Sequence, residues 1–379
     1  MKKIGILFGQ ENTFPQAFVD KVNAMGLPEI EAEFVEIGPV KEAVPSGYSV
    51  IVDRISHDVP FYRAYLKNAV LTGTDVINNP FWWSADDKFF NYALAAKLGV
   101  AVPRTVIVPH FQMPPDTNDV SFRNQQFPYD WRSVFEYVGF PAFLKPHDGG
   151  GWKDVHHVHN PDDFFRAYHQ SRDLCMTLQA AVKFREYFRC YVVGQREVRI
   201  MPYDPSRPHH ERYVKNPPTY EPGLLERVER DALTLCRALG YDLNTVEFAV
   251  EDGVPYAIDF MNPAPDADVH SVGQENFDWI VDAVARLAVE RAQANEGQGP
   301  ELRWAALLGH EGELAGAAKK AAKKGPPPPK KAPAKKGAGA KEAGMKGPGL
   351  KGPAKKAPAK KTAAKKQAAN ASREESIEG

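Results

Sequence analysis

The sequence predicts a mixed α/β fold over its first 310 residues, followed by a disordered basic tail. Short apolar runs alternate with helical patterns from the first strand onward, which is typical of a parallel α/β sheet. The aromatic content, 11% of the chain, suits well-packed domains. The formal charge of zero divides unevenly, because the first 310 residues carry 30 basic and 42 acidic side chains, a net charge of −12. An acidic folded body is therefore joined to a basic tail.

The first elements repeat the alternation of strand and helix. The apolar run after Lys3 is five residues long and ends before Gln10, so we predict a first β-strand rather than a signal peptide. No other segment approaches the length that spans a membrane, so no membrane partner is expected. Further strands are expected at residues 32–37 and 49–53, and helices at residues 14–25 and 61–71.

Polar side chains follow two of these strands directly. Glu11 comes after the first strand, and Asp53, Arg54 and His57 come after the third. In parallel α/β sheets ligands bind beyond the carboxyl ends of the strands, so these four are candidate substrate contacts. For each of them a loop cap or a surface ion pair is the alternative interpretation.

A strand at residues 75–80 leads into the next helix. We expect this helix to begin at an N-cap Ser84, with Asp87 at its third position, and to end at Lys97 before Gly99. Residues 100–108 then form a strand that a proline marks at its entry. Lys88 lies on this helix, where a lysine alone would usually be a solvated surface residue, but a second notable lysine follows in the sequence.

A second lysine, Lys145, lies in the apolar strand predicted at residues 140–146 and either serves a site or extends to water. Three glycines, Gly149, Gly150 and Gly151, follow it. Without Cβ atoms, such a loop lets backbone N–H groups approach a phosphate, although an ordinary flexible turn has the same composition. A helix from Asn160 to about residue 171 and a strand at 176–179 follow.

Two carboxylates and an amide are brought together by a predicted hairpin. Glu247 lies in a β-run at residues 245–250, Asp259 and Asn262 lie in a run at 255–263, and residues 251–253 form the turn. Magnesium prefers hard oxygen ligands, and buried carboxylates repel each other without a cation. A metal site is favoured over a structural pair.

Taken in order, these motifs resemble the ATP-grasp superfamily over roughly residues 1–295. The resemblance implies an ATP-grasp fold: a Rossmann-like N-terminal domain at 1–83, a central lobe at 84–180 and a C-terminal lobe with the metal site at 181–296. A linker at 297–318 and the disordered tail at 319–379 complete the predicted organisation. The resemblance implies ATP contacts, some to phosphates and others to adenine or ribose, from Lys88, Lys145, Gly149, Gly150, Gly151, Gln179, Ala180, Val182 and Glu186. It implies Mg²⁺, or Mn²⁺, at Glu247, Asp259 and Asn262.

Two positions depart from the family pattern. The last acid and the asparagine are commonly separated by one residue, whereas two residues separate Asp259 from Asn262. A β-bulge would be needed to aim both inward. Many ligases of the family carry an arginine two residues before the first metal acid, where this chain has Thr245. We expect Arg199 in the first place to supply that catalytic charge, with Arg189 or Lys215 as alternatives.

The histidines and cysteines indicate no zinc or redox site. His147, His156, His157 and His159 cluster near the glycines, but adjacent strand residues point to opposite faces and do not converge on a metal. Phosphate contact or solvent exposure is the expected role. The three cysteines are too widely spaced for a zinc knuckle, and they fit a reducing cytoplasm.

The tail between Lys319 and Lys366 contains 17 lysines and one acid, Glu342, among alanine, proline and glycine. It resembles the tails of linker histones and of some bacterial DNA-associated proteins. Too little apolar surface is present to offset the entropy of ordering, so we predict disorder. Residues 319–366 are expected to bind nucleic acid or polyphosphate without sequence preference, which would associate the chain with the nucleoid. A solvated tether that folds back on the acidic body is the alternative.

The resemblance implies a cytoplasmic ligase that uses Mg-ATP to join a carboxylate to an amine, both small molecules, through an acyl phosphate. Catalysis would rest on charge neutralisation and positioning. Two alternatives stay open. The absence of an arginine at position 245 also fits an ATP-grasp kinase that phosphorylates a hydroxyl, and the tail fits a non-catalytic nucleotide sensor tethered to nucleic acid.

Overall fold

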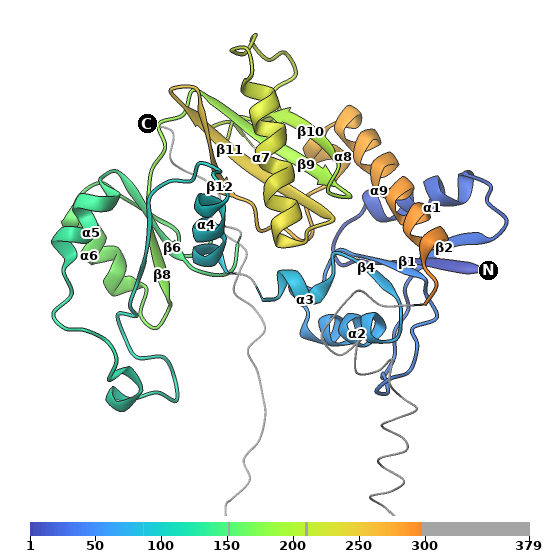
Figure 1. Ribbon diagram of the computed structural model, residues 1–379, viewed down its shortest axis with the longest axis horizontal. Coiled ribbons are helices and arrows are strands. Elements are labelled where there is room, and N and C mark those ends of the chain that lie inside the picture. Colours follow the sequence, from blue (N-terminus) through green and yellow to red (C-terminus); the bar gives the residue numbers. More distant parts are fainter. Residues whose placement is uncertain (86, 151, 209–210, 298–379) are drawn as a thin grey trace, which may run out of the picture. The chain divides into compact units, whose positions relative to one another are not determined.

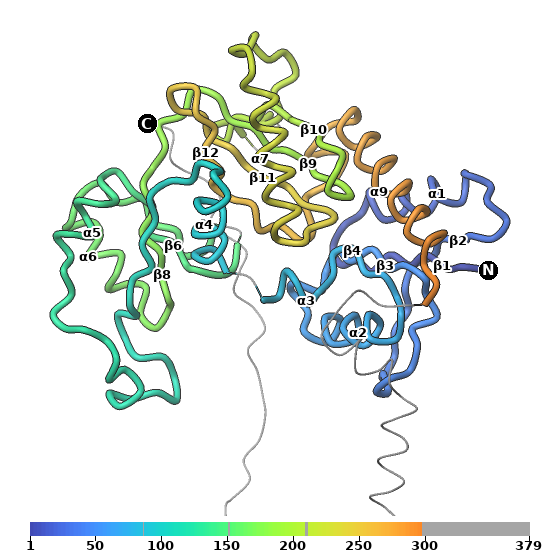
Figure 2. The backbone as a smooth tube through the Cα atoms, viewed as in Figure 1, coloured from blue at the N-terminus to red at the C-terminus, as the bar shows by residue number. Residues whose placement is uncertain are grey.

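The computed structural model describes residues 1–297 except residues 86, 151, 209 and 210. Their strands form three four-stranded sheets, which Figure 1 shows as ribbons and Figure 2 as a backbone trace. The mixed α/β class predicted from the sequence is confirmed. The tail at 319–379, nearly all of the predicted linker and Gly151 lie outside the described residues.

The N-terminal residues form a parallel sheet between helices. Its elements are β1 (Lys2–Leu7), α1 (Phe14–Ala24), β2 (Ile30–Phe34), β3 (Val50–Asp53), α2 (Pro60–Leu71) and β4 (Asp75–Ile77). The strand order is β2-β1-β3-β4, and every pairing is parallel. Ile4 and Ile6 pack in one core with α1 and with α9 (Gln274–Ala294), whereas Leu7 and Ile51 pack in a second core with α2. Because strand side chains alternate, helices cover both faces.

A second sheet is antiparallel and carries its helices on one face. Its elements are β5 (Thr105–Val108), the 3₁₀ helix η1 (Asp119–Phe122), α5 (Trp131–Val138), β6 (Ala142–Pro146), β7 (His156–Val158), α6 (Pro161–Gln170) and β8 (Met176–Ala180). The order is β5-β8-β6-β7. Leu144 and Leu178 pack in the core that α5 and α6 cover. The adjacent residues Lys145 and Gln179 therefore face the other side.

The third sheet is also antiparallel. Its elements are β9 (Glu186–Val193), β10 (Glu197–Pro202), α7 (Leu224–Leu239), β11 (Leu243–Glu251) and β12 (Val254–Asp259), followed by α8 (Val269–Val272) and α9. The order is β10-β9-β11-β12. Phe188 and Val246 pack against α7, which crosses the sheet in Figure 1. Arg189 and Glu247, one residue further along each strand, therefore lie on the opposite face.

The predicted hairpin is confirmed, because β11 and β12 pair and Asp252 and Gly253 adopt the left-handed conformation between them. The helix start predicted at Ser84 was wrong. A short helix, α3 (Pro80–Trp83), ends at Ser84, and α4 (Lys88–Lys97) begins after Asp87. The Asp87 carboxylate accepts a hydrogen bond from Phe90 N at 2.8 Å and is therefore the N-cap.

Candidate active site

Three charged residues form a row across neighbouring strands. Arg189 of β9 pairs in register with Glu247 of β11, and Glu247 pairs with Asp259 of β12. Directly opposed residues on antiparallel strands project from the same face. Phe248 pairs with Ala257, so a regular ladder would place Ile258 opposite Glu247; a register shift places Asp259 there instead. A bulge thus aligns the two carboxylates.

Glu247 lies between positive and negative neighbours. Arg189 Nε is 3.1 Å from Glu247 Oε1, and the Tyr187 hydroxyl donates a hydrogen bond to Oε2. Burial raises the pKa of Glu247; the Asp259 charge raises it further, while Arg189 opposes the shift. A cation bound beside Glu247 would therefore stabilise the charged form of its carboxylate.

Two lysines lie on the Asp259 side of the row. Lys88 Nζ is 3.4 Å from Asp259 Oδ1. Desolvation by itself would raise the pKa of Asp259, but the ammonium groups of Lys88 and Lys145 outweigh it and lower that pKa. The Asp259 side chain is 51% exposed, so its charged carboxylate is open to a ligand.

Lys145 is held by side-chain acceptors. Its Nζ donates to Tyr92 Oη and to Gln179 Oε1, both at 2.8 Å, and Tyr92 donates in turn to the Ile258 carbonyl at 2.6 Å. This chain of bonds links α4, β6 and β8 to the strand that carries Asp259. Burial lowers the pKa of Lys145, against the attraction of the nearby carboxylates.

The glycine loop begins beside Lys88. The Lys88 N–H donates to the His147 carbonyl at 2.9 Å, so the end of β6 lies against the start of α4. Gly149 has a φ of +78°, which favours glycine, and Gly150 is exposed. The start of the predicted phosphate loop therefore lies next to the backbone of Lys88, the first predicted phosphate lysine.

The expected adenine and ribose contacts begin at the end of β8. Gln179 is buried, and its side-chain amide also donates to Thr105 Oγ1 at 2.8 Å. Ala180 N–H donates to the Arg104 carbonyl, and Val182 lies in the irregular segment between β8 and β9. Glu186 is the first residue of β9 and pairs with Val250. The structure joins Gln179 to Lys145 by a hydrogen bond, whereas Glu186 begins a strand of the third sheet.

Of the three bases expected to replace an arginine at position 245, the structure brings Arg189 to Glu247. Arg199 pairs with Tyr191, one step further along the same face, and donates to Glu275 Oε1 at 2.6 Å and to Asn276 Oδ1 at 2.7 Å. Its guanidinium is thereby engaged by α9. Lys215 is exposed in the segment that follows β10.

Asn262 follows the bulged strand and is half-buried. Its backbone N–H donates to Asn244 Oδ1 at 3.1 Å, and the Asn244 amide also donates to the Phe260 carbonyl. Among the described residues no group of three His, Cys, Asp or Glu side chains is positioned to hold a metal ion. Glu247 and Asp259 are thus a pair of candidate ligands, with Asn262 as a neighbouring amide.

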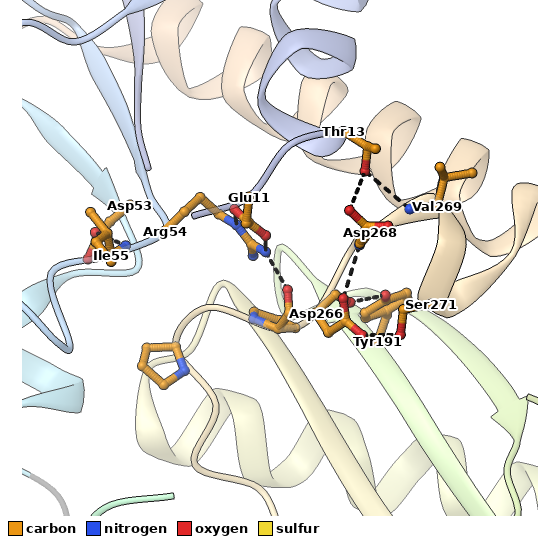
Figure 3. Close-up of polar contacts among 12 residues, drawn as sticks. Glu11, Thr13, Asp53, Arg54, Ile55, Tyr191, Asp266, Asp268, Val269 and Ser271 are labelled. Carbon is orange, nitrogen blue, oxygen red and sulfur yellow. Dashed lines mark hydrogen bonds and ion pairs between the residues drawn. The ribbon is translucent and has the colours of Figure 1, made fainter. Parts of the chain in front are cut away.

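The four candidate substrate contacts have partners within the protein, and Figure 3 shows the surroundings of Glu11, Asp53 and Arg54. Arg54 is buried, forms an ion pair with Glu11, and donates to the Pro265 carbonyl. Asp53 accepts hydrogen bonds from Ile55 N and from both the backbone and the hydroxyl of Ser56, as a loop cap does. His57 Nε2 lies 3.5 Å from Oδ2 of the exposed Asp58. Glu11 and Arg54 therefore tie the N-terminal sheet to the segment after β12.

Sequence reasoning missed the tyrosines of the site. Tyr92 lies one helical turn after Lys88, and Tyr187 lies two residues before Arg189 on the same strand face, so spacing alone contained a signal for both. Tyr203 and Tyr213, which flank Arg189, follow β10 in an irregular segment. No local pattern indicates their position.

A cavity of about 640 Å³ lies elsewhere, between the connection that follows β5 and helix α6. None of the candidate site residues lines it. Its wall is largely aromatic and includes Phe111, Phe127, Trp131, Phe165 and Tyr168. The charged row is therefore a separate feature from this cavity.

No family model matches the sequence, and no curated protein matches it. Solved structures do match. D-alanine–D-alanine ligase from Bacillus anthracis complexed with ATP is 16% identical, with a TM-score of 0.52 over 77% of this chain and 98% of that one. A RimK domain ATP-grasp protein from Sphaerobacter thermophilus is 17% identical, with a TM-score of 0.53 over 76% and 99%. The ATP-grasp ligase PsnB, complexed with minimal precursor, Mg and ADP, is 14% identical, with a TM-score of 0.51 over 76% and 98%.

These likenesses show the fold: the chain has the ATP-grasp fold that its motifs predicted. Among the described residues, no helix has both the length and the apolar character needed to cross a membrane.

Proposed function

We propose that this chain is an ATP-dependent ligase that joins a carboxylate to an amine through an acyl phosphate. The observation that carries the proposal is the charged row, with Lys88 on one side of Asp259 and Arg189 on the far side of Glu247. Two in-register carboxylates between cations suit a reaction in which phosphate charge is moved and neutralised. The solved ATP and Mg–ADP complexes of ligases with this fold support the same chemistry.

The donor set fits magnesium. Glu247 and Asp259 offer hard carboxylate oxygens, and Mg²⁺ usually takes only one or two protein carboxylates, with phosphate and water completing its shell. Burial and the charge of Asp259 raise the pKa of Glu247, and a bound cation would favour the charged form of this carboxylate. Mn²⁺ would suit the same oxygens, and Asn262 is a third candidate ligand. When bound, the metal would neutralise phosphate charge.

The nucleotide would occupy the side of the row that carries the lysines. Lys88 and Lys145 would bind phosphates as ammonium ions, and the N–H groups of Gly149 and Gly150 would approach them closely. Gly151, predicted to do the same, lies outside the described residues. The segment from Gln179 through Ala180 to Val182 would hold adenine, and Glu186 would bind the ribose hydroxyls.

The substrates would react on the Arg189 side. A carboxylate oxygen attacks the γ-phosphorus of ATP, and ADP leaves. The amine then attacks the acyl carbon, phosphate leaves, and the amine loses a proton to solvent. Arg189 would stabilise the negative charge on the acyl oxygen, which is the role expected of an arginine at position 245. Of the N-terminal candidates, His57 is the least committed to partners within the protein.

A kinase that phosphorylates a hydroxyl is the second candidate, favoured by Thr245. ADP release separates the two. Full-length protein with Mg-ATP is screened against pools of carboxylates, amines and hydroxyl compounds. A ligase releases ADP only when a carboxylate and an amine are both present. Release with a hydroxyl compound alone would replace the ligase by the kinase, and Mg-ATP binding without any release would favour the nucleotide sensor.

The tail, outside the described residues, is proposed to bind nucleic acid or polyphosphate through residues 319–366. Its lysines would release counterions from a polyanion, so the binding should weaken steeply with salt. Removal of residues 311–379 should abolish salt-sensitive binding to DNA while leaving Mg-ATP binding unchanged, as measured by electrophoretic shift and calorimetry. Equal DNA binding by the truncated chain would assign the polyanion site to the folded body.

A further inference from the structure

Arg189 is enclosed by two tyrosine rings. Its guanidinium carbon lies 5.2 Å from the centre of the Tyr203 ring and 5.9 Å from that of the Tyr213 ring. Arg189 Nη1 also donates a hydrogen bond to Tyr213 Oη at 3.0 Å. Both distances lie within about 6 Å, where a ring attracts a cation. The guanidinium is therefore held by contacts with two rings and by one of its donors.

The two tyrosines support each other. Tyr203 and Tyr213 form an antiparallel bridge, and their rings lie 5.1 Å apart at an interplanar angle of 76°. Tyr203 N–H donates to the Tyr187 carbonyl at 2.9 Å, so this segment is also bonded to β9 itself. The rings are thus fixed relative to the strand that carries Arg189.

The ion pair alone does not orient Arg189. Arg189 Nε is 3.1 Å from Glu247 Oε1, yet within the described part of the chain this buried nitrogen has no acceptor at hydrogen-bonding geometry. The contact is therefore electrostatic and only weakly directional. A metal bound by Glu247 would compete for the same carboxylate. The orientation of Arg189 must come from the tyrosines.

We propose that Tyr203 and Tyr213 are positioning residues that hold Arg189 at the reacting end of the site. This inference rests on the ligase function proposed above. An arginine at position 245 would reach the site along β11, whereas Arg189 comes from the neighbouring strand β9. Its long, flexible side chain needs separate support there, because ordering it costs conformational entropy that the contacts with the two rings offset.

The placement of Arg189 can be tested without a substrate. In the full-length protein, the arginine Nε–Hε correlations are recorded by NMR, and Arg189→Lys identifies the signal of Arg189. We expect Tyr203→Leu and Tyr213→Leu to move this signal toward those of exposed arginines, because the ring current and the cation–ring contact are lost. Tyr203→Phe, which keeps the ring, should leave it in place. Tyr213→Phe loses only the hydrogen bond and should shift it less than Tyr213→Leu.

Tyr137→Leu is the matched control, since Arg104 lies 5.8 Å from the Tyr137 ring and neither residue belongs to the proposed site. It should leave the Arg189 signal unchanged. If the Arg189 signal stays in place in both leucine variants, the proposed positioning of Arg189 by Tyr203 and Tyr213 is overturned. If a leucine variant does not fold, an unshifted signal in Tyr213→Phe overturns it instead.

Activity tests the catalytic consequence separately. With the carboxylate and amine found by the ADP-release screen, each leucine variant should lower kcat about 100-fold, because a misplaced catalytic group loses its geometry. The dissociation constant for Mg-ATP should stay unchanged, and Tyr203→Phe should restore kcat. Unchanged kcat with a shifted Arg189 signal would overturn the positioning role. If the wild-type protein releases no ADP with any carboxylate and amine, the ligase proposal fails. The NMR result would still show whether Tyr203 and Tyr213 hold Arg189 in place.

Discussion

Arg189 and Glu247 face each other in register on β9 and β11, with Arg189 Nε 3.1 Å from Glu247 Oε1. The pair places a permanent cation beside a carboxylate whose own charge is disfavoured by burial and by Asp259. Glu247 is also one of the two carboxylates proposed to bind magnesium, so this ion pair connects the proposed substrate side of the row with the proposed metal site. Most of the following predictions test one end of this row or the other.

Arg189→Lys should lower kcat for ADP release about 100-fold, because a lysine retains the charge but loses the planar donors that meet a developing oxyanion. Mg-ATP affinity should not change. Arg199→Ala is the control: its ion pair involves Glu275, which is 88% exposed, so we expect kcat within about twofold of wild type. The opposite ranking of the two variants would return the catalytic role to Arg199, as the sequence first suggested.

Mg-ATP binding should take up protons at alkaline pH. Burial lowers the pKa of Lys145, so part of the population loses its charge as pH rises through that lowered value. A bound phosphate favours the ammonium form, which means that binding restores the proton and weakens with increasing pH. Calorimetry in buffers with different ionisation enthalpies measures the uptake.

Lys145→Ala should bind Mg-ATP weakly and without this proton uptake. Lys97→Ala, at the exposed end of α4, should behave as wild type. Proton uptake that persists in Lys145→Ala would assign it to another group and remove Lys145 from the nucleotide site.

Asp259→Asn should raise the Mg²⁺ concentration needed for tight ATP binding by about 10- to 100-fold, the order of the loss in metal affinity when a metal site is altered. The measurement is ATP affinity as a function of Mg²⁺ concentration. Asp252→Asn, in the turn of the same hairpin, is the control, because its φ of +50° suits asparagine. An unaltered magnesium dependence in Asp259→Asn would refute the proposed metal pair.

Glu11→Gln should destabilise the protein by about 3–5 kcal/mol, since it leaves the buried Arg54 guanidinium without its counter-charge. Urea unfolding measures this loss, and Glu31→Gln on the exposed side of β2 should change little. A normal unfolding midpoint together with a raised KM for the carboxylate would instead make Glu11 a substrate contact.

Local sequence patterns predicted most of the secondary structure near the site. The hairpin around residues 251–253, the strand that ends at Lys145 and Pro146, and the helix capped by Asn160 all follow from periodicity and turn chemistry that act over a few residues. The start of α4 was misplaced because Ser84 and Asp87 both offer N-cap chemistry, and a preceding short helix took Ser84 as its end.

Long-range contacts could not be predicted in this way. Asn78 shows why: its buried amide donates to the carbonyls of Leu243 and Pro263 and accepts from the N–H groups of Asp242 and Leu243. These partners lie more than 160 positions away in the chain. No pattern around Asn78 identifies them.

The sequence by itself determined that this chain has alternating strands and helices, a hairpin with two acids, a lysine shortly before a glycine-rich loop and a basic tail, because each depends on neighbouring residues. The tertiary structure decided which of these side chains meet. The bulge that brings Asp259 opposite Glu247, the contact of Arg189 with Glu247, and the two tyrosines around Arg189 all depend on strand register and on packing between distant segments. Such pairings are determined by the energy of the whole fold, which no local window of sequence contains.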